Sequence, residues 1–343
     1  MYQKLPKQQI RCQLCNHFCL IAEGQLSICG VRQNIKGSLF SLNYGRLITE
    51  AVDPIEKKPI FHLNPGSSTY SIATMGCNLK CANCQNWEIS QVPGLASLGG
   101  ASADRETHLP GYKVTPAEII DRAIESNCRS ISYTYTEPTI FFEFALACMK
   151  IAKTKGLKNI WVTNGYMSIV CLKKIIPYLD ATNVDLKFFT EELYQKNCQC
   201  KLKPILDNLK ILKQSQILLE ITTLIIPGLT DRDNQLTKIA QFIAKDLSTE
   251  VPWHLSSFSP EISYQLQDFK TTPLKLIDQA YNLGQEAGLK YIYVGNVPND
   301  NRQNTYCSQC RTLLVERRGR QVKNYLTANH CLNCADRLPL IIG

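Results

Sequence analysis

The fold of this chain is decided by the stretch Gly76-Cys77-Asn78-Leu79-Lys80-Cys81-Ala82-Asn83-Cys84-Gln85-Asn86, which holds three cysteines at the spacing C-x3-C-x2-C. An apolar run over residues 70–75 leads into this stretch and predicts a buried strand. The three cysteines are therefore expected to lie together on the loop that follows the end of a strand.

Three thiolates on one loop favour an iron–sulfur cluster over a structural zinc ion. A structural zinc ion takes four protein ligands, which close its coordination. A cube-shaped 4Fe-4S cluster takes one cysteine thiolate per iron, so Cys77, Cys81 and Cys84 would leave one iron open to the amino and carboxylate groups of a small molecule. The spacing alone leaves two alternatives, which are three unrelated thiols and a zinc site completed from elsewhere in the chain.

Residues from 68 to about 297 alternate between strand and helix patterns. Helical spacing of apolar residues follows the capping box at Thr115 to Glu118, runs from Pro138 to Gly156, and begins again at Thr272. Short apolar runs between such segments predict strands at residues 69–75, 129–134, 159–163, 180–186, 217–225, 252–257 and 290–294. This alternation indicates an α/β fold in which helices cover a parallel sheet, as in a partial or complete TIM-like barrel. A doubly wound sheet is the alternative, although no G-x-G-x-x-G motif follows the first strand.

The composition is that of an ordinary soluble protein, with 44% hydrophobic and 20% charged residues. No apolar run reaches the ~18 residues that would span a bilayer, and the first residues lack the apolar core of a signal peptide. We therefore expect a cytoplasmic protein that does not enter a membrane. In that reducing compartment, sixteen cysteines indicate metal binding rather than disulfide bonds.

Eight of the remaining cysteines gather near the two ends of the chain. The C-terminal group consists of two C-x2-C pairs and predicts a zinc-ribbon site, with His330 as a bystander: Cys307, Cys310, Cys331 and Cys334. The N-terminal group has less regular spacing: Cys12, Cys15, Cys19 and Cys29. This second group fits zinc, which we favour, or an auxiliary cluster, or a site in which His17 replaces one thiol.

The net charge of +9 has two interpretations. A basic surface attracts acidic partners, and for a cluster protein the expected partner is an acidic electron donor such as a flavodoxin or ferredoxin. Spread over a chain of this size, the same charge would serve only solubility.

Polar residues follow several of the predicted strands or lie within them. They are Glu137, Asn164, the pair Asp185 and Lys187, and His254. In a parallel barrel the active site lies at the carboxyl ends of the strands, so these side chains and the cysteine loop are expected to form one site. Each residue also has an ordinary structural interpretation: a helix-start carboxylate for Glu137, an ion pair for Asp185 and Lys187, and a half-buried histidine for His254.

Together these motifs resemble the radical SAM superfamily. The resemblance implies that a 4Fe-4S cluster donates an electron to S-adenosylmethionine and that the resulting 5′-deoxyadenosyl radical abstracts a hydrogen atom. It also implies that Glu137 receives the methionyl ammonium, a pairing that suits a carboxylate. Asn164 would contact the ribose or the methionine carboxylate, Asp185 and Lys187 both of these groups, and His254 the ribose. Ile226-Pro227-Gly228 matches the element beside the adenine.

A closer resemblance covers nearly the whole chain. The motifs Cys29-Gly30-Val31-Arg32, Asp53-Pro54-Ile55-Glu56-Lys57-Lys58-Pro59 and Gln85-Asn86-Trp87-Glu88 resemble the radical SAM protein of the AmmeMemoRadiSam system, a group similar to pyruvate formate-lyase activating enzyme. AMMECR-type and MEMO-type proteins are the partners that this resemblance implies. The chain departs from the pattern in having Asn83 where an aromatic residue is usual, in lacking Gly-Gly before Glu137, and in carrying Cys198-Gln199-Cys200 at an expected turn.

We therefore expect a cysteine-rich extension over residues 1–67, a radical SAM barrel of the (β/α)6 type over 68–300, and a zinc-ribbon-like extension over 301–343. The leading substrate class is a protein, as for glycyl-radical activases, and the alternative is a small metabolite or RNA. A non-catalytic zinc module for nucleic acid is a different class of function. It suits the basic charge, although the sequence has no basic stripe with interleaved aromatic residues.

Overall fold

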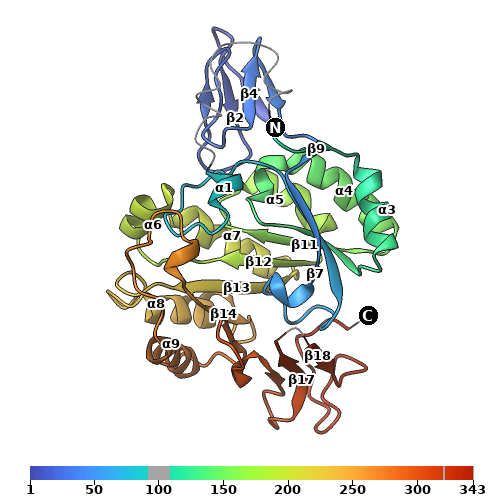
Figure 1. Ribbon diagram of the computed structural model, residues 1–343, viewed down its shortest axis with the longest axis vertical. Coiled ribbons are helices and arrows are strands. Elements are labelled where there is room, and N and C mark those ends of the chain that lie inside the picture. The colour runs from blue at the N-terminus through green and yellow to red at the C-terminus, as the bar shows by residue number, and fades with distance from the viewer. Residues whose placement is uncertain (92–108, 320, 343) are drawn as a thin grey trace.

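The computed structural model describes residues 1–91, 109–319 and 321–342, and its centre is one large sheet (Figure 1). Seven parallel strands form most of the sheet: β8 (Ser68–Ala73), β10 (Ser130–Tyr133), β11 (Lys158–Thr163), β12 (Ala181–Asp185), β13 (Leu218–Ile225), β14 (Trp253–Ser257) and β15 (Ile292–Gly295). They lie in the order β8-β10-β11-β12-β13-β14-β15, so strands that follow one another along the chain are neighbours in space. Each predicted strand matches one of these seven, and the α/β fold class is confirmed.

The parallel strands are apolar because helices or loops cover them. Strand β10 is buried along its whole length, and β8 is buried at every residue after Ser68. The register sets Ile131 of β10 opposite Tyr70 of β8, and Ile221 of β13 opposite Trp253 of β14. A continuous core follows from this pairing, and the strand ends that carry the polar residues are held in fixed relative positions.

Helices follow most of the strands and lie around the sheet (Figure 1). They are α1 (Trp87–Ser90), α3 (Pro116–Glu125), η2 (Pro138–Phe141), α4 (Phe142–Thr154), α5 (Ile169–Ile175), η3 (Ile176–Tyr178), α6 (Glu191–Cys198), α7 (Lys203–Gln214), α8 (Gln235–Phe242), η4 (Ile243–Leu247), η5 (Pro260–Ile262) and α9 (Leu274–Glu286). The capping box of α3 is confirmed, since Thr115 and Glu118 bond each other's backbone N–H groups. The helix predicted from Pro138 begins as a 3-10 turn and ends at Thr154, two residues before Gly156.

The first part of the chain forms a small module of short strands at one end of the molecule (Figure 1). Its strands are β1 (Tyr2–Lys4), β2 (Ile10–Cys12), β3 (Leu20–Ile21), β4 (Arg32–Ile35), β5 (Ser38–Ser41) and β6 (Arg46–Leu47), and β6 pairs with β9 (Tyr112–Lys113). Strand β7 (Thr49–Pro54) then leaves this module and pairs antiparallel with β8. The domain boundary at residue 67 stays a prediction. Strand β7, which precedes this boundary in the sequence, is part of the main sheet.

The C-terminal module lies at the opposite end of the molecule (Figure 1). It contains η6 (Asn301–Gln303), β16 (Thr305–Tyr306), β17 (Leu313–Arg318) and β18 (Gln321–Asn324), and the three strands form an antiparallel sheet. Leu314, Val315, Leu326, Leu338 and Leu340 form a small core of its own beside the buried cysteines Cys307 and Cys331.

Candidate functional site

The cysteine loop follows β8 and is held in place from two sides. The backbone N–H groups of Lys80 and Ala82 donate to the oxygens of Cys198 and Asn197, at 3.1 and 2.8 Å, where α6 ends. On the other side Gly76 has a φ of +98°, and a Cβ atom there would lie 2.7 Å from the backbone oxygen of Cys29. Only glycine fits this close approach, which places the loop directly against the N-terminal module.

The three thiols of the loop lie in surroundings that disfavour free thiolates. Burial and the neighbouring Cys81 raise the pKa of Cys77 well above its ordinary value, and burial also raises the pKa of Cys84. A hydrogen bond with Cys198, followed by burial, raises the pKa of Cys81. Thiolates in such a place need bound positive charge to be stable, which a metal centre supplies.

The spacing of these thiols fits a cluster better than a single ion. Among the described residues, Cys77, Cys81 and Cys84 do not form a set whose sulfur atoms all lie within 4.8 Å of one another. Thiolates around one zinc ion lie about 3.8 Å apart, given Zn–S bonds of about 2.3 Å in a tetrahedron. In the described part of the chain, the Nδ2 of Asn78 is also buried without a hydrogen-bond partner, so an unused donor lies next to Cys77.

A chain of hydrogen bonds joins Glu137 to the cysteine loop. The two carboxylate oxygens of Glu137 accept from the Thr163 hydroxyl at 2.9 Å, and one of them accepts from the Asn164 backbone N–H at 2.9 Å. Thr139 donates its backbone N–H and its hydroxyl to Glu137 as well. The Nδ2 of Asn164 then donates to the Oδ1 of Asn78 at 2.8 Å. The structure therefore brings Glu137 and Asn164 together with the loop, and both are buried.

Burial dominates the electrostatics of Glu137. It raises the pKa of this carboxyl although the Thr139, Asn164 and Thr163 hydrogen bonds act in the opposite direction. Glu137 lies at the start of η2 and accepts from the Thr139 backbone N–H, which agrees with the helix-start interpretation. It also accepts from Thr163 and Asn164, which the sequence does not predict. Its contact with the methionyl ammonium stays a prediction.

Asp185 and Lys187 form the expected ion pair at the end of β12, at 2.7 Å. Burial alone would lower the pKa of Lys187. The neighbouring Asp185 carboxylate and the Cys81 and Cys198 thiols have a larger effect in the opposite direction, so the pKa of Lys187 lies well above its ordinary value. Lys187 therefore lies at the cysteine loop with its positive charge intact. The thiol of Cys198, the last residue of α6, neighbours both Cys81 and Lys187.

The structure does not bring His254 together with these residues. His254 is the second residue of β14, near the amino end of that strand, and its Nε2 donates to the Oε2 of Glu220 at 2.5 Å. The buried carboxylate of Glu220 also accepts from the backbone N–H groups of Phe61 and His62. This buried pair explains the position of His254, because a buried Glu220 carboxylate without a partner would strongly destabilise the folded protein. The carboxyl edge of the sheet lies at the other end of the strand.

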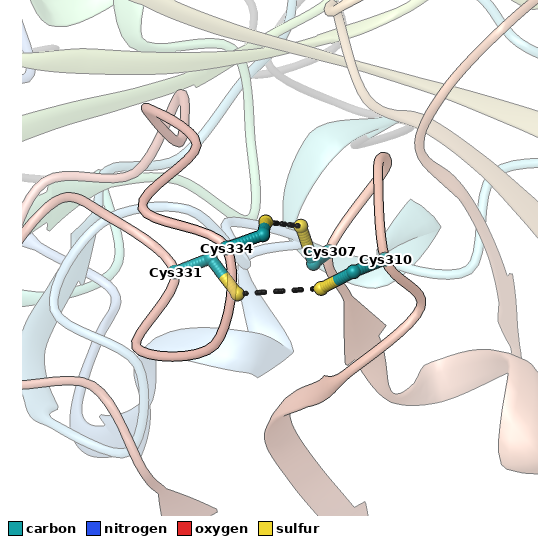
Figure 2. A group of neighbouring side chains, drawn as sticks. All are labelled: Cys307, Cys310, Cys331 and Cys334. Carbon is teal, nitrogen blue, oxygen red and sulfur yellow. Dashed lines mark hydrogen bonds between the residues drawn. The ribbon is translucent and has the colours of Figure 1, made fainter.

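The C-terminal cysteines form a compact group, as predicted (Figure 2). The Sγ atoms of Cys307 and Cys334 lie 3.6 Å apart, as do those of Cys310 and Cys331, and all four atoms lie within 4.8 Å of one another. A hydrogen bond from the Thr312 hydroxyl is the main cause that lowers the pKa of Cys310 to about 5. The compact group does not include His330, which is exposed.

The N-terminal cysteines are arranged differently. All four line one hollow in the N-terminal module, together with His17 and Asn78. The Nε2 of His17 donates to the backbone oxygen of Asn78 at 2.7 Å, and burial lowers the pKa of this histidine. The N-terminal module therefore touches the cysteine loop on the residue next to Cys77.

Sequence reasoning missed three residues of the site and its surroundings. Asn78 connects Asn164 to the loop, and its position beside Cys77 was the available signal. Glu220 was detectable as a single acidic residue within the apolar strand Leu218–Ile225. Cys198 was noted in the sequence as a departure from the expected turn, and the structure shows that its thiol lies at Cys81.

Comparisons with known proteins agree with the geometry. The model of the radical SAM superfamily matches residues 71–240, which include the cysteine loop and strands β10 to β13. An uncharacterized protein of Methanocaldococcus jannaschii is 38% identical over 99% of this chain and 98% of its own length. The pyruvate formate-lyase-activating enzyme of Clostridium pasteurianum is 21% identical over 66% of this chain and 92% of its own.

A solved domain of a pyruvate-formate lyase-activating enzyme from Bacteroides vulgatus is 16% identical, with a TM-score of 0.43, and its match covers 49% of this chain and 99% of the domain. The chain belongs to the radical SAM superfamily and is homologous to glycyl-radical and pyruvate formate-lyase activating enzymes. Within the described residues, no helix has the length and apolar character needed to cross a membrane.

Proposed function

We propose that this protein is an oxidoreductase of the activating-enzyme kind, which generates a radical on a protein substrate. A 4Fe-4S cluster on Cys77, Cys81 and Cys84 would supply the electron that cleaves S-adenosylmethionine to the hydrogen-abstracting 5′-deoxyadenosyl radical. The observation that carries this proposal is the C-x3-C-x2-C loop at the carboxyl end of the first parallel strand, in a chain homologous to activating enzymes.

The first step is tested by measuring 5′-deoxyadenosine after anaerobic reduction of the reconstituted protein. Wild type should form it, and Cys77→Ala, Cys81→Ala and Cys84→Ala should each lose it together with cluster iron. Cys128→Ala is the matched control, because Cys128 is buried but lies in none of the three cysteine groups. Full activity and full iron in any of the three loop variants would refute the ligand assignment.

We further propose that S-adenosylmethionine binds across the ends of β10, β11 and β12. Asn164 and the ion pair of Asp185 and Lys187 neighbour the cysteine loop, which supports contacts from them to the methionine carboxylate and the ribose. Glu137 has the charge to receive the ammonium group, and through its bond to the Asn164 backbone it also orients that residue. We assign no such contact to His254, because Glu220 pairs with it near the amino end of β14.

This binding site is tested with Glu137→Gln, which keeps the size of the side chain and removes its charge. Loss of a charge-assisted hydrogen bond, worth roughly 1.5–3 kcal/mol, should weaken S-adenosylmethionine binding about tenfold to a hundredfold. Glu118→Gln is the control, because Glu118 is an exposed carboxylate at the start of α3. Anaerobic titration into the reconstituted proteins measures both affinities, and equal affinities would remove Glu137 from the site.

The protein substrate is tested by anaerobic capture from a cell extract on the immobilised protein. The captured fraction should increase 5′-deoxyadenosine formation and give an organic radical signal in electron paramagnetic resonance, with the Cys81→Ala protein as the control. A small metabolite or RNA as substrate would instead be indicated by stimulation from a protein-free extract. AMMECR-type and MEMO-type proteins are the partners to look for among captured proteins, in the cytoplasm where we expect the reaction to occur.

We also propose that the C-terminal group binds one zinc ion. Sulfur separations of 3.6 Å are close to the ~3.8 Å expected around tetrahedral zinc. Four thiolates close this coordination, so the ion would be structural. A flavodoxin or ferredoxin is the proposed electron donor, supported by the net charge of +9.

A further inference from the structure

A hollow lies where the N-terminal module meets the cysteine loop. Four cysteines line it: Cys12 at the end of β2, Cys15 and Cys19 on the loop between β2 and β3, and Cys29 shortly before β4. Thiol side chains from one short segment, residues 12–29, thus converge on one space. Leu14, Ile28 and Ile140 supply apolar walls.

The hollow also holds an unused hydrogen-bond donor. Arg32 lines it and is almost completely buried, and Glu143 accepts from two of its nitrogens, at 3.0 and 2.5 Å. Within the described residues the Nε of Arg32 is buried and has no hydrogen-bond partner. A buried N–H donor beside four thiols is a suitable partner for a thiolate or an inorganic sulfide, which hydrogen bonds stabilise.

The four thiols are spread too widely for zinc. In the C-terminal group all four sulfur atoms lie within 4.8 Å of one another, whereas no three ligand atoms of the N-terminal cysteines and His17 meet that limit in the described chain. A 4Fe-4S cluster places four irons and four sulfides between its thiolates, so its cysteine sulfurs stand further apart than those around one ion. Cys77, Cys81 and Cys84 share this wider arrangement.

We propose that Cys12, Cys15, Cys19 and Cys29 bind a second iron–sulfur cluster, of the 4Fe-4S type. This assignment favours the auxiliary cluster over the zinc ion that the sequence spacing favoured. Four thiolates leave no iron open, so this cluster can exchange electrons but cannot chelate S-adenosylmethionine. It would share a wall with the first cluster site, because Asn78 lines the hollow and follows Cys77 in the chain.

The proposal is tested in the full-length protein carrying Cys77→Ser, Cys81→Ser and Cys84→Ser together. This variant is reconstituted anaerobically with iron and sulfide, and iron, sulfide and zinc are counted per chain. We expect about four irons and four sulfides to remain, with the brown absorbance and the reduced-state paramagnetic resonance of one cluster. Wild type under the same conditions should hold about eight irons.

The reciprocal variant carries Cys12→Ser and Cys29→Ser. It should fall from about eight irons to about four, while Cys128→Ser with Cys148→Ser, which changes two buried thiols outside the groups, should keep about eight. This second variant decides the question if the first one does not fold.

The outcomes separate this inference from the proposed function. A wild-type protein that forms 5′-deoxyadenosine, holds about four irons and binds two zinc ions would refute the second cluster and leave the function standing. The same conclusion would follow if the Cys12 and Cys29 variant kept all its iron. A wild type with two clusters but no 5′-deoxyadenosine would refute the proposed reaction and leave the second cluster standing.

Discussion

The two cysteine-rich ends of this protein have the same number of thiols and different geometry. The C-terminal four are drawn into a compact group by two C-x2-C pairs on one small antiparallel sheet. The N-terminal four surround a hollow beside the cysteine loop. The regular C-x2-C spacing thus predicts a compact thiol group in the C-terminal module, whereas the less regular spacing over residues 12–29 does not predict how far apart the N-terminal thiols lie.

The two modules also differ in what they touch. The C-terminal module packs on the amino end of the sheet, where Arg317 donates to the backbone oxygen of Phe61 at 2.9 Å and Tyr293 bonds Thr305 at 2.9 Å. The N-terminal module contacts the cysteine loop through His17 and Gly76. Disturbing the first module should therefore spare the cluster loop, and disturbing the second should reach it.

The largest effect is expected from removing the proposed C-terminal zinc with Cys307→Ser and Cys331→Ser together. Structural zinc contributes roughly 10–16 kcal/mol of apparent binding free energy, so the module should unfold locally. Zinc analysis should show the loss of about one ion, and limited proteolysis should cut after residue 300. The absorbance of the iron–sulfur clusters should not change. Loss of iron in this variant would contradict the separation of the two ends.

A smaller effect is expected from the buried histidine beside the C-terminal module. His62 donates from Nδ1 to the Pro339 oxygen and accepts from the Tyr293 hydroxyl, and burial lowers its pKa from about 6.5 to about 4. Between these values the unfolded chain binds a proton that the folded protein does not. Stability should therefore fall as the pH is lowered from 6.5 to 4, by up to about 3 kcal/mol from this group.

Urea unfolding at pH 7 and pH 5 measures this dependence. In His62→Gln the difference between the two pH values should be smaller than in wild type, while the exposed His330→Gln should behave like wild type. An unchanged pH dependence in His62→Gln would show that other groups cause it.

The contact at Gly76 should give the next effect. Gly76→Ala would place its Cβ 2.7 Å from the Cys29 oxygen, whereas Gly156→Ala has open space around it at a similarly positive φ. Both variants should lose about 1–2 kcal/mol from the left-handed backbone, and Gly76→Ala should lose a further ~1–3 kcal/mol from the clash. Thermal unfolding of the two variants measures the difference in stability. Equal losses of stability would mean that the N-terminal module moves away from the new Cβ atom with no loss of free energy.

The smallest effect is expected at His17. His17→Ala removes the hydrogen bond to the Asn78 oxygen, a change worth about 1 kcal/mol of stability. Because Asn78 also accepts from Asn164, S-adenosylmethionine affinity should fall slightly, and His17→Gln, which keeps a donor, should restore part of it. Equal affinities in wild type and His17→Ala would show that the N-terminal module does not support the binding site.

Much of this protein follows from patterns that are local in the chain. The apolar run before Gly76 predicts β8, the box at Thr115 predicts the start of α3, and the pairs at Cys307 and Cys331 predict a compact four-thiol group. These features are predictable because strand burial, helix capping and a short thiol spacing each depend on a few neighbouring residues.

The tertiary structure alone decided how distant residues meet. Spacing favoured zinc for the N-terminal cysteines, whereas among the described residues their sulfur atoms form no compact group of the kind seen at the C-terminal end. Family resemblance associated His254 with the ribose, and the buried Glu220 instead holds it near the amino end of β14. Asn78, Asn164 and Glu137 lie up to 86 residues apart and form one hydrogen-bonded chain. Such contacts form because buried polar groups require hydrogen-bond partners, and the packing of the strands decides which groups lie close enough to bond. No local pattern in the sequence predicts which partners these are.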